Sequence, residues 1–294
     1  MSTRKTSKLW FGIGAAALAG GSVAHMASAS QLIGTTRDAT PPSAAASAVE
    51  NGHDMRFAAA ATATARQGGE GGESGAAADV LDPRVRFLRD LSLIRGHLLV
   101  GDELVQAGLW DDALPHFFHP VEEIYPAIGE KLKVQGYRQF DDALKALTQA
   151  VLSKNAGAYA TARKIVGIRL NDTDLAMKRF AEPLVSTRVA TAIAVLRTAA
   201  SEYGAAAVDG RITLPVEYQD GRGFVLHAEQ MLESIAKDLE AKDPAALAAT
   251  RAAMADLKLA WPTAVPPAAA AKTAAAVLAS VSRVELAAGA FLKK

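Results

Sequence analysis

Imidazole and carboxylate side chains gather in one stretch of the sequence, between Gly96 and Glu130. Three of the chain's six histidines lie here, and the residues from His116 onward read H-x-x-H-x-x-E-E. On a helix, His119 and Glu123 would share one face, with Glu122 beside them. Nitrogen and oxygen ligands of this kind suit a divalent or ferric transition metal. The spacing therefore predicts a metal site.

A structural interpretation of the same residues stays open. Pro120 could take the first position of a helix, where Glu122 and Glu123 would favour the positive N-terminus. His116 and His119 would then be half-buried partners at a kinked corner.

Two more histidines border apolar helix faces. His97 lies at the edge of the face made by Phe87, Leu91, Ile94 and Leu98, and His227 lies between Leu226 and Met231. Bundles commonly build metal sites from inward histidines and glutamates on facing helices. The candidate metal ligands are, in order of preference, His116, His119 and Glu123, then Glu122, His97 and His227. Glu217 and Asp220 precede His227 on the same broad face and are residues of interest outside this ligand set.

Helices must position these residues. The chain is rich in alanine, its aromatic content is 6 %, and no strand pattern persists. Asp82-Pro83 predicts a first helix start and Gly108 its end. Three prolines, at 115, 120 and 126, predict breaks in a second helical region, 110–133. Further helices are expected at 140–153, at 156–170, from Glu182-Pro183 to 209, at 215–239, and from Asp243-Pro244 to 261. A turn or cap is expected at 171–174, after the second of these. A final helix is expected after Pro266-Pro267, with Val277, Leu278, Val281 and Val284 facing inward.

The fold predicted is all-α, an up-and-down bundle of about seven helices or two stacked four-helix-like bundles, over residues 81–294. Residues 1–29 are predicted to be a signal peptide, with a basic start, an apolar run from Leu9 to Ala19, and small residues up to a cleavage site near Ala29. The alternative is an uncleaved anchor. Residues 30–80 are predicted to be a disordered linker rich in Ala and Gly. We therefore expect a periplasmic protein.

Several classes of function are disfavoured. The chain has no cysteine, so a metal site must use nitrogen and oxygen ligands. A formal net charge of +1 does not favour nucleic-acid binding. No transmembrane span is expected after the signal, since the run from Pro266 to Val281 is interrupted by Lys272. The chain lacks a phosphate loop, a G-x-S-x-G elbow and an H-E-x-x-H motif, so no enzymatic activity is expected.

One segment carries a family resemblance. The pattern from Glu202-Tyr203 through Ala207-Val208-Asp209-Gly210 and Ile212 to Glu217-Tyr218 resembles the soluble periplasmic part of FTR1-type iron permeases. The chain lacks the R-E-x-x-E motif of the permease itself. The helical, exported layout is also similar to imelysin-like iron-regulated proteins, whose H-x-x-E motif is matched by His119 and Glu122. These resemblances imply a metal-handling role and add Tyr218 to the residues of interest.

The function expected is therefore a periplasmic metal-binding accessory protein for metal uptake or homeostasis, with a membrane metal transporter as its partner. Iron is the favoured ion, and copper or zinc are the alternatives. The competing hypothesis is a non-catalytic exported helical scaffold, or a ligand-binding module without metal.

Overall fold

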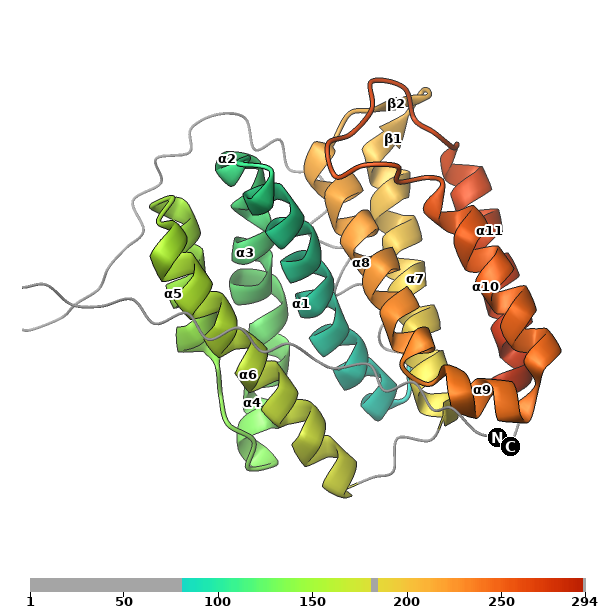
Figure 1. The fold of residues 1–294 in the computed structure, drawn as a ribbon, viewed down its shortest axis with the longest axis horizontal. Coiled ribbons are helices and arrows are strands. Elements are labelled where there is room, and N and C mark those ends of the chain that lie inside the picture. Colours follow the sequence, from blue (N-terminus) through green and yellow to red (C-terminus); the bar gives the residue numbers. More distant parts are fainter. Residues whose placement is uncertain (1–80, 181–184, 293–294) are drawn as a thin grey trace, which may run out of the picture. The chain divides into compact units, whose positions relative to one another are not determined.

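The computed structural model describes residues 81–180 and 185–292, except for the side chains of residues 175–180. The predicted signal peptide, the predicted linker and the Glu182-Pro183 helix start lie outside the described residues. Within them the all-α prediction is confirmed, because helices make up nearly all of the regular structure (Figure 1).

Helix α1, Pro83–Gln106, begins at the predicted cap. The Asp82 carboxylate accepts hydrogen bonds from the backbone N–H groups of Arg84 and Val85, which have no partner inside the helix. A cap of this kind stabilises a helix by about 1 kcal/mol. The helix ends before Gly108, whose φ of +78° suits glycine.

The proline-rich segment after α1 is broken as predicted. It forms α2 (Trp110–Ala113), α3 (Pro115–His119), a π-helical turn η2 (Pro120–Ile124) and α4 (Tyr125–Val134). Pro126 has no N–H, so the Glu122 carbonyl cannot receive the usual α-helical hydrogen bond. The Tyr125 N–H instead reaches the Pro120 carbonyl, five residues back, which is the π-helical pattern.

Helices α5 (Asp141–Leu152) and α6 (Ala156–Phe180) follow and pack against each other. The turn or cap predicted at residues 171–174 is wrong, because α6 continues through it. Tertiary contacts hold this stretch in the helix: the Arg95 guanidinium donates to the Leu170 carbonyl at 3.0 Å and to the Asp174 carboxylate at 2.7 Å.

A small hairpin joins the next two helices, α7 (Val185–Ala206) and α8 (Pro215–Glu233). Its strands, β1 (Ala207–Val208) and β2 (Arg211–Ile212), pair antiparallel. Asp209 and Gly210 both have positive φ, as a two-residue hairpin turn requires. The sequence pattern missed these strands because only two residue pairs form.

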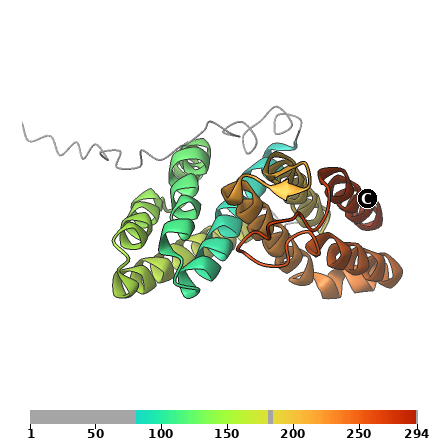
Figure 2. The same cartoon turned by 90° about the horizontal axis from the view of Figure 1, so that it is seen from above.

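The remaining elements are α9 (Ala236–Lys242), α10 (Pro244–Lys258), α11 (Ala274–Ala288) and the 3₁₀ turn η3 (Gly289–Phe291). The predicted helix at 215–239 is split, because α8 ends at Glu233 and α9 begins at Ala236. Helices α7, α8, α10 and α11 pack as a four-helix bundle (Figures 1 and 2). Helix α1 packs on α7 and α8 and also on α3, so α1 joins this bundle to the elements from α2 to α6.

The stretch Ala274–Phe291 is long and apolar enough, by length and composition, to cross a membrane. One third of it (33 %) is buried inside the fold, where α11 packs on α10 and α7. Val277, Val281 and Val284 are buried as predicted, whereas Leu278, expected inward, is 60 % exposed. The absence of a membrane span stays a prediction.

Candidate metal centre

Two helices that carry candidate ligands meet at a pair of glycines. A Cβ built on Gly223 of α8 would lie 2.2 Å from the carbonyl oxygen of Gly96 on α1, and a Cβ on Gly96 would lie 2.5 Å from the Phe224 ring. Neither position could hold a side chain without moving the helices apart. Gly96 precedes His97, and Gly223 follows Asp220 by about one helical turn. The close crossing therefore brings His97 and Asp220 together.

Helix α3 adds two more imidazoles from the other side of α1. At Gly101 of α1, a Cβ would lie 2.7 Å from the Phe117 ring and 3.4 Å from the His116 Cβ, so α3 also sits close to α1. The Thr148 hydroxyl of α5 donates to the Phe117 carbonyl at 2.6 Å and fixes α3 from behind. His116 and His119, about one turn apart, consequently point toward the same place.

Three imidazoles converge on one carboxylate. The Nδ1 atoms of His97 and His116 lie 2.8 and 2.7 Å from Asp220 Oδ1. His119 Nδ1 lies 3.3 Å from Asp220 Oδ2, and the His97 and His119 rings meet edge to face with centroids 5.3 Å apart. We call these four residues, His97, His116, His119 and Asp220, the His/Asp cluster.

The His/Asp cluster keeps a deeply buried carboxylate ionised. Asp220 is 2 % exposed, and an uncompensated carboxylate at such depth would cost several kcal/mol. Burial raises the pKa of Asp220, but the charges of His97 and His116 and hydrogen bonds from His116 and His119 outweigh it and hold the pKa well below its usual value. Burial lowers the pKa of His119, but the hydrogen bond and charge of Asp220 outweigh it, so the net direction is upward.

The imidazoles are not equivalent. His116 is fully buried and faces an oxygen on each side, because its Nε2 lies 2.9 Å from Gln219 Oε1 and its Nδ1 faces Asp220. Binding an ion through His116 would displace one of these contacts. His119, with 26 % of its side chain exposed, is the member of the His/Asp cluster most open to solvent.

The other predicted residues lie around the His/Asp cluster or away from it. Glu123 is half-buried, with Oε1 3.9 Å from His119 Nε2, whereas Glu122 is exposed. Glu217 is half-buried on α8, and burial together with the nearby Asp220 charge raises its pKa, against the opposing charges of His119 and His116. Tyr218 is buried and donates its hydroxyl to the Thr263 carbonyl at 2.9 Å, which ties α8 to the segment after α10.

The structure places His227 elsewhere. It lies seven residues beyond Asp220 on α8, about 10 Å along the helix axis. Its side chain lines a separate cavity with Arg95 and Gln230. His227 is therefore not a member of the His/Asp cluster.

Three donor atoms lie close enough to be drawn together around one metal ion. One donor atom each from His97, His119 and Asp220 lies within 4.8 Å of the others. Metal–ligand distances of about 2.0–2.2 Å place the donors of one ion within about 4.4 Å of each other, so a small inward movement would suffice. Two imidazoles and one carboxylate are a ligand set typical of non-haem iron(II), and zinc takes the same ligand types.

Asp220 was not among the predicted metal ligands, and no role was predicted for Gln219. A local signal could have drawn attention to both residues. Gly221 and Gly223 lie inside a predicted helix, where glycine is unfavourable unless another group packs closely. A Cβ on Gly221 would indeed lie 2.9 Å from the Trp261 ring.

Residues 183–294 match the family model of the iron permease-associated 4-helix bundle domain. This confirms the resemblance to the helical part of iron permeases over the range that contains α7 to η3. Asp220, Gln219 and Glu217 lie inside the matched range, and the three histidines of the His/Asp cluster precede it. Comparison with curated proteins and with solved structures found no match.

Proposed function

We propose that this protein binds an iron ion at the His/Asp cluster and serves iron uptake as a periplasmic accessory of a membrane iron transporter. The observation that carries the proposal is the convergence of His97, His119 and Asp220, from three different helices, to within 4.8 Å. The match of residues 183–294 to an iron permease-associated domain supports iron as the ion and a permease as the partner.

Each residue has a distinct part in this proposal. His97 and His119 would supply nitrogen ligands and Asp220 an oxygen ligand. His116, held between Asp220 and Gln219, would orient the carboxylate. The half-buried Glu123 beside His119 would offer a further oxygen, which a ferric ion favours. The role is capture and delivery, with the ion as cargo and no catalytic step.

A specific observation favours the competing role, a helical scaffold without metal. Asp220 already faces three imidazoles, and His116 has an oxygen contact at each ring nitrogen. A network of this kind can stabilise a bundle by itself. The two roles differ in one testable respect: the histidines bind an added metal ion in the first role and do not bind it in the second.

The deciding experiment is calorimetric titration of the untagged full chain with iron(II) under anaerobic conditions, and separately with iron(III), zinc and copper. We expect one ion per chain with micromolar or tighter affinity, weakened at least about tenfold by His119→Gln. His227→Gln is the matched control, because it removes a histidine outside the His/Asp cluster, and it should leave the affinity unchanged.

A folded chain that takes up none of these ions would overturn the proposal. The scaffold role predicts that outcome, together with a lower melting temperature for His119→Gln. Tighter binding of zinc or copper than of either iron ion would keep the site and overturn iron as its cargo.

A further inference from the structure

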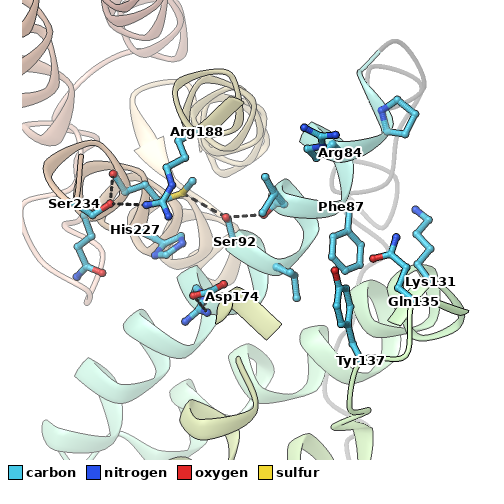
Figure 3. A pocket seen from close by; sticks show the side chains of 16 residues that line it. Arg84, Phe87, Ser92, Lys131, Gln135, Tyr137, Asp174, Arg188, His227 and Ser234 are labelled. Carbon is cyan, nitrogen blue, oxygen red and sulfur yellow. Dashed lines mark hydrogen bonds and ion pairs between the residues drawn. The ribbon is translucent and has the colours of Figure 1, made fainter. Parts of the chain in front are cut away.

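A cavity of about 750 Å³ lies between the first half of α1, the C-terminal end of α8 and the segment that follows α4 (Figure 3). Helices α6 and α7 contribute Asp174 and Arg188 to its wall. A volume of this size is typical of sites for small organic molecules. The cavity does not include any member of the His/Asp cluster.

Part of the wall is apolar. Phe87 and Leu91 are buried on α1, and Met231 comes from α8. In Figure 3 the rings of Phe87 and Tyr137 point toward each other on one side of the cavity. These groups would cover the apolar body of a ligand, and the two rings favour a flat one.

The charged groups of the wall are mostly cationic. Among the described lining residues, Arg84, Arg95, Lys131 and Arg188 are basic and Asp174 is the one acidic residue. Asp174 accepts from Arg95 at 2.7 Å, so its charge is already balanced. Arg188 donates to the Ser234 hydroxyl at 3.2 Å, which is a neutral partner. Figure 3 shows Arg188, Ser234 and His227 grouped on the side opposite Phe87.

His227 adds a neutral polar group to this wall. Burial and, to a smaller extent, the charge of Arg95 lower its pKa to about 3, against a hydrogen bond with Gln230 that acts in the opposite direction. The imidazole therefore remains uncharged near neutral pH and can donate one hydrogen bond and accept another.

We propose that this cavity is a binding site for a small organic anion, an aromatic or aliphatic body that carries one carboxylate or sulfonate group. Phe87, Leu91 and Met231 would hold the body. Arg188, beside Ser234 and His227, would bind the anionic group. Lys131, on the Phe87 side of the cavity, would add to the excess of positive charge among the described wall residues.

Two fluorescent probes that differ by one charged group test this assignment. Anilinonaphthalene sulfonate has an apolar aromatic body with a sulfonate, and N-phenylnaphthylamine has nearly the same body without it. We expect the wild-type chain to bind one molecule of the sulfonate, and to bind it at least about tenfold more tightly than the neutral probe.

Variants that remove positive charges test which side chains attract the sulfonate. Arg188→Gln combined with Lys131→Gln should weaken binding of the sulfonate about tenfold and leave binding of the neutral probe unchanged. Lys133→Gln combined with Arg138→Gln removes the same charge from exposed positions outside the cavity and should change neither affinity. Arg84→Gln, at an exposed position of the cavity rim, is a second test if the first double variant does not fold, and should weaken the sulfonate alone.

The proposal fails if the folded wild-type chain shows no saturable binding of the sulfonate, or if it binds both probes equally. It also fails if the cavity variants and the Lys133/Arg138 control lose affinity to the same extent, because the effect would then come from net charge alone.

Discussion

The carbonyl oxygen of Gly96 faces the Cα of Gly223 so closely that a Cβ on Gly223 would lie 2.2 Å away. This contact sets the separation of α1 and α8 at the level of the His/Asp cluster. His97 and Asp220 flank the contact on the two helices, and their 2.8 Å approach depends on it. The geometry of the site is therefore determined partly by two residues without side chains.

Gly223→Ala should disturb the site without touching a ligand. We expect the free energy of unfolding to fall by about 1–3 kcal/mol, because the added methyl group overpacks the crossing. Metal affinity, measured by calorimetry on the folded variant, should fall with it. Gly204→Ala on α7 is the matched control, since nothing lies within 4 Å of its Cβ, and it should stabilise the chain by up to about 1 kcal/mol. Wild-type metal affinity in Gly223→Ala would show that the crossing does not set the site.

Glu122 and Glu123 are adjacent in the sequence but should behave differently. Glu123→Gln removes a carboxylate beside His119 and should weaken binding of iron(III) about tenfold. Glu122→Gln changes an exposed side chain and should stay within about twofold of wild type. Parallel calorimetric titrations check both values. Equal losses in the two variants would mean that overall charge, rather than position, controls the affinity.

His227 should make the fold sensitive to mild acid. Its pKa is about 3 in the folded chain and about 6.5 when unfolded, so the unfolded chain takes up the proton first as the pH falls. The free energy of unfolding should therefore decrease as the pH falls from about 6.5 toward 3, by about 2 kcal/mol at pH 5. Urea unfolding at pH 7 and pH 5 measures this loss, and His227→Gln should remove about that part of it. An unchanged loss in the variant would contradict the burial of a neutral imidazole.

Metal removal should lower the stability of the chain. At a free ion concentration of 100 times the dissociation constant, binding stabilises the folded state by about 2.7 kcal/mol. Thermal unfolding with added zinc, a redox-inert probe, should show a higher midpoint that a chelator returns to the metal-free value. His119→Gln should show a much smaller rise. A midpoint that does not respond to any of the ions would favour the scaffold role.

Local signals predicted most of the fold. Asp82-Pro83 and Asp243-Pro244 start helices where expected, and both aspartates accept hydrogen bonds from the first turn. The continuation of α6 through residues 171–174 could not be read locally. Arg95, about 80 positions away in the sequence, donates to the Leu170 carbonyl just before this stretch and to the Asp174 side chain within it.

The site was only partly predictable for the same reason. The H-x-x-H spacing indicated that His116 and His119 act together, and the edge position of His97 suggested an inward direction. The central place of Asp220 depends on the crossing of α1 and α8, which no local pattern encodes. His227 shows the opposite case: it shares a helix with Asp220, yet lines the 750 Å³ cavity instead of the His/Asp cluster.

The His/Asp cluster straddles the boundary of the matched domain, with imidazoles from α1 and α3 before it and the carboxylate from α8 inside it. An ion held there would add a cross-link between two segments of the chain that also meet through packing and through the Arg222–Glu103 ion pair. When the ion is present, amide hydrogens on both sides of the boundary should therefore exchange more slowly. Release of the ion would, by the same linkage, weaken the contact between the two segments.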